Sequence, residues 1–244
     1  ADVDFVNPDA KGSLAHIRQL LFDGRYAEAE TVAKETMMGD KKVGSSYQTL
    51  GDLHLKMAHG ESVSEYRREL DLNNSVASVS YTVNDTRYNR EVFSSAADQV
   101  IAIRLTANKK RSISLQVELT RPGGKALIEI TDQEFWMREH VGDGSGVKLT
   151  AGIRILPEGG SIKSSGKALV VDKPDALTFL ISATTNYRLK NHDSVCQNYL
   201  RNAAAQRYER LRQRHLADYQ KYFNRVSFDL AADETIDSPT DTRL

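Results

Sequence analysis

The hydrophobic positions change their spacing twice along the chain. Between residues 9 and 38, apolar side chains recur every three or four positions, which is the spacing of an amphipathic helix. Asp23 and Gly24 interrupt this pattern and predict two short helices joined by a turn. Residues 24–30 look like half of a tetratricopeptide repeat, but no second copy follows at that repeat's period, which argues against a helical solenoid.

From residue 47 the spacing becomes that of β-strands. Apolar residues alternate with polar ones around Leu53 and Leu55, and comparable short segments follow as far as residue 183. Short strands at hairpin spacing predict an antiparallel β-sandwich. Ala168–Val171 and Ala176–Ala183 are continuously apolar, which predicts central strands covered on both faces. We expect hairpin turns at Asn73-Asn74, Asn84-Asp85, Pro122–Gly124, Gly142–Gly146 and Pro157–Gly160.

Helical spacing returns after Tyr187. Apolar and aromatic residues form a single stripe that predicts one long helix near the carboxyl end. The polar positions of this helix are rich in arginine, whereas residues 228–244 hold five acidic residues against the single cation Arg243. A solvated helix face followed by a flexible acidic linker explains this charge pattern, and the alternative is a helix that braces a second domain. We expect the chain to be the front part of a larger protein.

The composition argues against several classes of function. The 33 basic residues balance 33 acidic ones, so no net field draws the chain to nucleic acid or to an anionic membrane surface. No apolar run approaches the ~20 residues of a membrane-spanning helix. The chain starts at Ala1, and we expect an upstream piece to have been removed. Strands and helices do not alternate, which argues against a parallel nucleotide-binding sheet.

Few residues carry recognisable chemistry. The glycine clusters lack the spacing of a phosphate-binding loop, so we expect no cofactor. His192 and the single cysteine, Cys196, lie four positions apart, as metal ligands on a helix do, but no second pair accompanies them. A buried structural cysteine is the favoured interpretation, and we expect no metal and no internal disulfide.

Two acidic pairs and one aromatic pair are candidates for carbohydrate chemistry. The acidic pairs are Glu69 with Asp71, and Asp132 with Glu134. Paired carboxylates beside a sugar-stacking ring are the groups that glycoside hydrolysis uses, but solvated acids at strand edges are the favoured interpretation here. Phe135 and Trp136 are the substrate-binding candidates, as an exposed aromatic platform. A core tryptophan is the favoured alternative for Trp136.

Several longer strings resemble one enzyme family. These strings are Tyr47–Leu55, Tyr66–Leu72, Tyr88–Ser95, Asp98–Leu105, Leu177–Tyr187, His215–Val226 and Pro239–Leu244. In this order they are similar to parts of glycoside hydrolase family 95, the α-L-fucosidases: the amino-terminal domain, the helical linker and the lead-in to the catalytic domain. The resemblance extends from Asn7 to the carboxyl end.

The resemblance implies a fold and a division of the chain. The fold is mainly β, an antiparallel β-supersandwich of the galactose-mutarotase or hydrolase-65 N-terminal type, with an amino-terminal helical hairpin and a long carboxyl-terminal linker helix. Residues 1–40 are then a helical segment of the sandwich domain and 41–190 the sandwich itself. Residues 191–226 are the linker helix, and 227–244 lead toward an (α/α)6 catalytic barrel. Family members have further strands before Asn7, so another chain could fill the sandwich edge, and the oligomeric state stays open.

In the family, the catalytic acid and the fucose pocket lie in the barrel. The resemblance therefore implies no catalytic residue, no metal and no cofactor in this chain. The implied activity of the whole enzyme is inverting hydrolysis of terminal α-L-fucosyl linkages. The implied partners are the barrel and a fucosylated oligosaccharide, with no nucleic acid and no membrane insertion. The implied location is secreted or periplasmic, in a polysaccharide-degrading bacterium.

We therefore expect a non-catalytic β-sandwich domain that stabilises its own catalytic barrel. The interface candidates are the stripe residues Tyr208, Leu211, His215, Tyr219 and Phe223. The alternatives are a carbohydrate-binding module that uses Phe135 and Trp136, and an assembly domain that contacts no sugar. We expect the chain alone to be inactive and the whole protein to be an enzyme, and the residues leave open which sugar and linkage the whole protein recognises.

Overall fold

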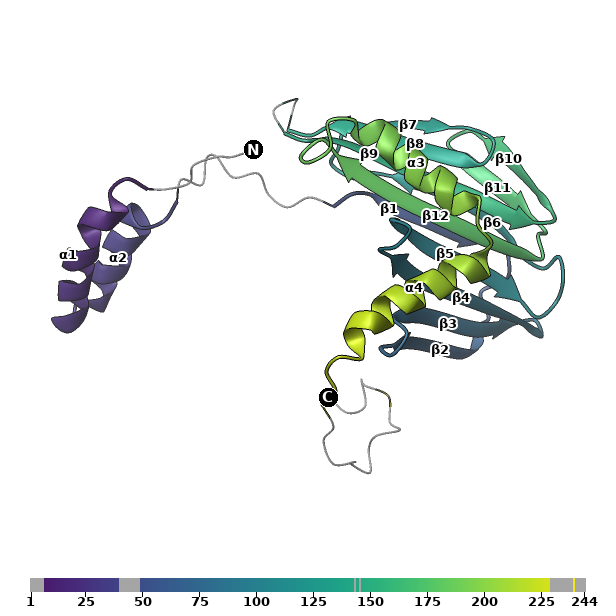
Figure 1. Cartoon of the computed structure of the whole chain (residues 1–244), viewed down its shortest axis with the longest axis horizontal. Coiled ribbons are helices and arrows are strands. Elements are labelled where there is room, and N and C mark those ends of the chain that lie inside the picture. Colours follow the sequence, from purple (N-terminus) through teal and green to yellow (C-terminus); the bar gives the residue numbers. More distant parts are fainter. Residues whose placement is uncertain (1–6, 40–48, 143, 145, 229–238, 240–244) are drawn as a thin grey trace.

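The computed structural model describes residues 7–39, 49–142, 144, 146–228 and 239, and Figure 1 labels its elements. Within these ranges the chain forms a pair of helices, a β-sandwich of two sheets and two further helices, which confirms the predicted mainly β fold. Residues 1–6, residues 40–48 and most of the predicted linker 227–244 lie outside the described residues. None of the helices in the described ranges combines the length and hydropathy that a bilayer crossing requires.

The amino-terminal helical hairpin is confirmed. Helix α1 spans Ala10–Phe22 and helix α2 spans Tyr26–Thr36. Gly24 makes the turn between them at φ +74°, a left-handed conformation that glycine adopts without steric cost. Ile17, Leu20 and Ala29 are buried between the two helices and form a small core of their own. Its assignment to the sandwich domain stays a prediction.

The strands of the described ranges form two antiparallel sheets. The larger, eight-stranded sheet has the order β2-β3-β4-β5-β12-β9-β8-β7, and the smaller sheet has the order β1-β6-β11-β10. The strands are β1 (Asp52–Met57), β2 (Ser64–Asp71), β3 (Val76–Val83), β4 (Thr86–Ser95), β5 (Val100–Ala107), β6 (Ser114–Thr120), β7 (Leu127–Ile130), β8 (Glu134–His140), β9 (Lys148–Glu158), β10 (Ser161–Ser165), β11 (Ala168–Asp172) and β12 (Ala176–Thr185).

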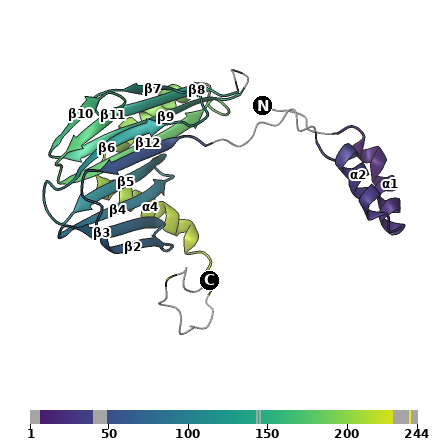
Figure 2. The same ribbon diagram turned by 180° about the vertical axis from the view of Figure 1, so that it is seen from behind.

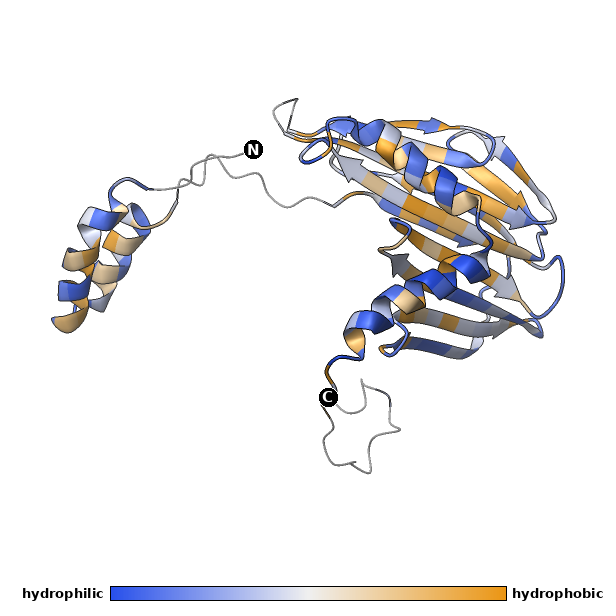
Figure 3. Ribbon diagram, in the orientation of Figure 1, coloured by the Kyte–Doolittle hydropathy of each residue, from blue (hydrophilic) through white to orange (hydrophobic). Residues whose placement is uncertain are grey.

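The main core lies between the two sheets. Successive side chains of a strand point to opposite faces, so every second residue of a strand can enter the core. Strand β6 shows this pattern, because Leu115, Val117 and Leu119 are buried and their neighbours are half-buried. They pack with Phe135 of β8 and Ile155 of β9 from the facing sheet. Figure 3 shows hydrophobic residues recurring along the strands and hydrophilic ones along the outward side of the carboxyl-terminal helices.

Some predicted turns do not join hairpin strands. Asn84-Asp85 connects β3 to its antiparallel neighbour β4, with φ of 48° and 57°, and Gly142–Gly146 lies between the paired strands β8 and β9. The hairpin prediction is wrong for Pro122–Gly124, which lies between β6 and β7 of different sheets, and for Gly159-Gly160, which joins β9 to β10. Turn residues mark a reversal of the chain, but they do not determine which sheet the next strand enters.

The two continuously apolar strands differ in their surroundings. Strand β12 lies between β5 and β9, and Ala176–Leu180 are all buried, which confirms a strand covered on both faces. The same prediction is wrong for β11. That strand is central in the four-stranded sheet, but Val170 is 39% exposed because the outer face of the strand points to solvent.

The predicted single long helix is two helices. Helix α3 spans His192–Ala204 and helix α4 spans Tyr208–Phe223. Arg207 between them has extended backbone, although the break contains neither glycine nor proline. A tertiary contact holds the break, because the Gln206 side-chain amide donates a hydrogen bond of 3.0 Å to Asp98 in the β4–β5 turn. The stripe spacing could not show this contact.

Both helices cover the face of the eight-stranded sheet that points away from the four-stranded sheet (Figures 1 and 2). Helix α3 packs on β12 and β9, and α4 packs on β4. Their buried side chains Leu200 and Leu211 join Phe93 and Leu180 of the sheet in a second apolar cluster. The eight-stranded sheet is therefore a central layer with apolar side chains on both faces.

Candidate functional site

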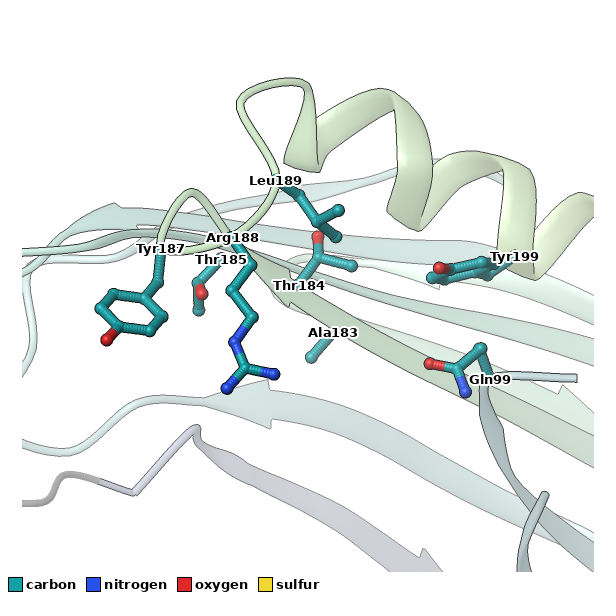
Figure 4. Close-up of a pocket in the computed structure, with 8 residues that line it drawn as sticks. All are labelled: Gln99, Ala183, Thr184, Thr185, Tyr187, Arg188, Leu189 and Tyr199. Carbon is teal, nitrogen blue, oxygen red and sulfur yellow. The ribbon is translucent and has the colours of Figure 1, made fainter. Parts of the chain in front are cut away.

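An open cleft of about 730 Å³ lies where β12 ends and the chain turns toward α3. It is lined by Gln99, Ala183, Thr184, Thr185, Tyr187, Arg188, Leu189 and Tyr199. In Figure 4, the Arg188 guanidinium extends between Tyr187 on one side and Gln99 on the other, and the Tyr199 ring comes from α3. These side chains offer hydrogen bonds and aromatic surface, but no carboxylate lines the cleft.

A second groove of about 510 Å³ lies between α4 and the ends of β3 and β4, and we call it the α4 groove. It is lined by Ser75, Ser94, Ala96, His215, Asp218, Tyr219, Tyr222 and Phe223. Its surface is largely aromatic and aliphatic, and Asp218 is the one carboxylate in this lining. Such a surface suits packing against an apolar partner better than acid–base chemistry, which needs two positioned carboxyl groups in a glycosidase.

The stripe residues of α4 face this chain's own sheet. Leu211 and His215 are 1% and 4% exposed, and Tyr208 packs against the same apolar cluster. Leu211 and His215 are thus buried against the sandwich and not available to a further domain, whereas contact of the half-buried Tyr208 with such a domain stays a prediction. Tyr219 is half-buried, and Phe223 is 39% exposed at the end of α4. Phe223 remains an interface candidate.

Tyr208 anchors the first turn of α4 to the sheet. Its hydroxyl donates a hydrogen bond of 2.7 Å to Glu91 Oε2 on β4. Burial raises the pKa of the Tyr208 phenol, and the hydrogen bond to Glu91 raises it further. The Arg104 guanidinium lies 5.1 Å from the centre of the Tyr208 ring, within the range of a cation–π interaction. Tyr208 is thus a neutral hydrogen-bond donor with a structural role.

Two further residues fix α4 to the β2–β3 turn. The Nε2 atom of His215 lies 3.0 and 3.1 Å from the carbonyl oxygens of Asn74 and Ser75, so this nitrogen carries a hydrogen. One helical turn later, the Tyr219 hydroxyl donates a hydrogen bond of 2.7 Å to the carbonyl of Leu72. These bonds to backbone oxygens set the position of the helix along the sheet.

The aromatic pair does not form an exposed platform. Phe135 is 0% exposed and lies in the core between the sheets, so it is not available to a sugar. Trp136 points to the opposite face, where it is half-buried beside the cluster under α3. Its Nε1 donates a hydrogen bond of 2.9 Å to Glu134, and the Arg138 guanidinium lies 5.6 Å from the ring centre. Adjacent residues of a strand cannot present both rings to one ligand.

Three members of the two acidic pairs, Glu69, Asp71 and Glu134, make local contacts. Glu69 pairs with Arg67 at 2.8 Å, and Asp71 accepts a hydrogen bond of 2.9 Å from the Asn73 backbone N–H in the β2–β3 turn. Glu134 bonds Trp136 and lies 3.3 Å from Arg154, whereas Asp132 is exposed. None of the four lines either cleft. They contribute turn and surface contacts, in line with the favoured interpretation.

Cys196 is a buried structural cysteine. It is 0% exposed, and its Sγ lies 3.4 Å from the carbonyl oxygen of Ser182 on β12. Burial raises the pKa of the Cys196 thiol, which keeps it protonated and unreactive. In the part of the chain that the structure describes, no group of three or more His, Cys, Asp or Glu side chains is arranged to hold a metal ion.

The sequence did not predict that two carboxylates tie the helices to the sheet. The Asp98 side chain is only 3% exposed and accepts hydrogen bonds from Ser95 at 2.9 Å, Gln206 at 3.0 Å and Arg214 at 2.9 Å. It therefore joins the β4–β5 turn to the α3–α4 break and to α4. No signal in the sequence could have found this role, because an aspartate in a turn normally indicates a solvated side chain.

Asp193 plays the equivalent part at the start of α3. Its carboxylate accepts hydrogen bonds from Arg138 at 2.7 Å, from Thr150 at 3.1 Å and from Gln197 at 2.8 Å. The bond from the Arg138 guanidinium is the main cause that lowers the pKa of Asp193, and Thr150 adds to it. A carboxylate in the first turn also interacts favourably with the helix dipole. An aspartate at a helix start was a usable signal for this position.

Comparison with known proteins relates the chain to carbohydrate-active enzymes. The family model described as Glycosyl hydrolase family 65, N-terminal domain, matches residues 3–190. The chain is 30% identical, over an alignment 277 positions long, to "Alpha-L-fucosidase 2" from Arabidopsis thaliana, and this alignment covers 98% of this chain and 32% of that protein. It is 25% identical over 244 residues to "Probable alpha-fucosidase A" from Aspergillus niger, with 92% and 30% covered.

The chain thus spans about a third of the length of these curated relatives. Among solved structures, "Putative kojibiose phosphorylase from human microbiome" is similar with a TM-score of 0.48 and 12% sequence identity. That similarity covers 70% of this chain and 27% of the other.

Proposed function

Because this chain belongs to the family described as Glycosyl hydrolase family 65, N-terminal domain, we propose that it is the non-catalytic β-sandwich domain of a larger α-L-fucosidase-like hydrolase. The names of the two relatives support the fucosyl substrate. The motif strings from Tyr47 to Leu244 support placing the whole enzyme in glycoside hydrolase family 95. Its activity would then be inverting hydrolysis of terminal α-L-fucosyl linkages.

One observation carries the non-catalytic role. The linings of the β12–α3 cleft and the α4 groove together contain a single carboxylate, Asp218. Inverting hydrolysis uses an acid that protonates the leaving oxygen and a second group that activates water, ~6.5–9.5 Å apart. No such pair faces either cleft. We therefore assign the acid and the water-activating groups to the domain that follows this one, an (α/α)6 barrel.

The contribution of this chain is mechanical support. Helices α3 and α4 are fixed on the eight-stranded sheet by Asp193 and Asp98 and by apolar packing of Leu200 and Leu211. A helix pair held in this way gives the following domain a rigid point of attachment.

From the resemblance to glycoside hydrolase family 95, we also propose that the whole enzyme is exported, to the periplasm or the medium of a polysaccharide-degrading bacterium.

Release of fucose from an α-1,2-fucosylated oligosaccharide tests the proposal. The assay compares the 244-residue chain, the separately produced following domain, and a mixture of the two, with the longer polypeptide as the positive control. We expect no fucose release from the 244-residue chain and release from the longer polypeptide. Fucose release by the 244-residue chain alone would refute the non-catalytic role, and its own carboxylates would then be the place to look.

A further inference from the structure

Large apolar side chains are exposed where the chain leaves α4. Tyr222 is 57% exposed, Phe223 39%, Val226 82% and Phe228 84%. We call these four residues the α4 end patch. Single exposed apolar residues are ordinary, but four within seven positions form a local concentration that soluble surfaces rarely carry without a partner.

The patch continues an interface that already exists within this chain. A column of stacked rings runs from Phe93 in the buried cluster through His215 and Tyr219 to Phe223, with centroid distances of 4.8, 6.1 and 5.1 Å. Exposure rises along this column, from 2% at Phe93 and 4% at His215 to 39% at Phe223. The apolar stripe of α4 therefore runs past the part of the helix that the sheet covers.

The patch has a cationic rim. Lys221 Nζ lies 5.4 Å from the centre of the Tyr222 ring, and the Arg225 guanidinium carbon lies 4.9 Å from it. Both cations thus sit over the aromatic surface, at distances typical of cation–π contacts. The α4 groove adjoins the same residues, because Tyr222 and Phe223 line it. The complementary surface is apolar at its centre and acidic at its edge.

We infer that the α4 end patch is the docking surface for the catalytic domain that follows in the same polypeptide. This inference rests on the proposed function. Residues 224–228 lead the chain away from the sandwich at this patch, and Val226 and Phe228 belong to that segment. The relatives are about three times as long as the chain, and the matched family is named as an N-terminal domain.

Hydrogen exchange measured by mass spectrometry tests the surface. The longer polypeptide is compared with the 244-residue chain, peptide by peptide. We expect amides of residues 219–228 to exchange at least about tenfold more slowly in the longer polypeptide. Slower exchange on another face of the sandwich, with 219–228 unchanged, would overturn this surface and leave the proposed function standing. No slowing anywhere on the sandwich would overturn the supporting role itself.

A paired substitution gives the second test. The double variant Val226→Ser, Phe228→Ser should leave the melting temperature of the 244-residue chain unchanged, because both side chains are more than four-fifths exposed there. In the longer polypeptide it should lower the melting temperature. The matched control is Leu127→Ser, at a residue 61% exposed on β7 at the far edge of the sheet, which should act equally in both. An equal effect of the double variant in both proteins, or a dimer of the 244-residue chain that buries the patch, contradicts the inference.

Discussion

Replacing Gly152 by alanine should loosen helix α3 from the sheet. Gly152 lies on β9, opposite Trp136 of β8 and Ser182 of β12, and α3 crosses the strand at this point. An added Cβ would lie 2.6 and 2.8 Å from the Trp136 ring atoms Cζ3 and Cη2, and closer still to Leu200 Cδ1 of α3. Cβ atoms in proteins essentially never show contacts below 3.0 Å, so something must shift.

The surroundings set the size of the effect. Leu200 is 1% exposed and cannot swing into solvent, so either its rotamer or the whole helix must move. Overpacking of this kind costs about 1–3 kcal/mol. In a domain of this size, each kcal/mol lowers the melting temperature by about 2–4 °C. Gly152→Ala should therefore melt about 2–12 °C below the wild-type chain.

Differential scanning calorimetry measures this shift, and another glycine supplies the control. Gly12 of α1 has nothing within 4 Å of its added Cβ, and alanine is the better helix former by about 1 kcal/mol, so Gly12→Ala should not destabilise. The double variant Gly152→Ala, Leu200→Ala should lose less free energy of unfolding than the sum of the losses of the two single variants, because the shortened side chain at position 200 removes part of the clash. A Gly152→Ala chain that melts with the wild type would refute the close approach of α3 to β9.

Three further outcomes are expected. The folded state lowers the pKa of Asp193 through Arg138, so the ionised carboxylate stabilises the fold above its unfolded pKa of about 3.9, and this stability is lost as pH falls through the lower folded value. In urea unfolding at pH 7, Asp193→Asn should thus have a lower free energy of unfolding than the wild type, and this difference should become smaller below about pH 4. A difference that stays constant with pH contradicts this prediction. Cys196 should react with a thiol reagent only as fast as the chain unfolds, because it is 0% exposed, whereas reaction at the rate of a free thiol would place it at the surface. Asp98→Ala should lower the free energy of unfolding by about 1.5–3 kcal/mol, because it removes the acceptor shared by Gln206 and Arg214. The control Asp132→Ala, at an exposed position, should leave the free energy of unfolding unchanged. Equal effects of the two changes would show that Asp98 does not anchor the helices.

The spacing of apolar and polar residues over short segments was sufficient to predict the fold class. The alternation around Leu53 and Leu55 and the apolar run of Ala176–Ala183 correctly indicated an antiparallel sandwich with a covered central strand. The helical hairpin was also correct, since its spacing and the turn at Gly24 are local properties of the chain. Likewise, the position of Cys196 near a helix start correctly favoured a buried thiol.

The candidate site was less accessible to such reasoning. The stripe of α4 was predicted to contact a further domain, whereas Leu211 and His215 are buried against the chain's own sheet, because periodicity reports which side of a helix is apolar and not what covers it. Phe135 illustrates the same limit, since its side chain lies between the sheets while Trp136 lies on the opposite face. The anchoring role of Asp98 could not be predicted, because its partners Gln206 and Arg214 are more than a hundred positions away in the chain.

The sequence by itself determined which segments are strands and which are helices, and which face of each is apolar, because these depend on side-chain spacing over a few residues. Only the tertiary structure decided which sheet each strand joins after a turn, where the predicted long helix breaks into α3 and α4, and that α4 packs on its own sandwich. These features depend on contacts between residues far apart in the chain, such as Asp98 with Gln206, whose energies local patterns do not contain.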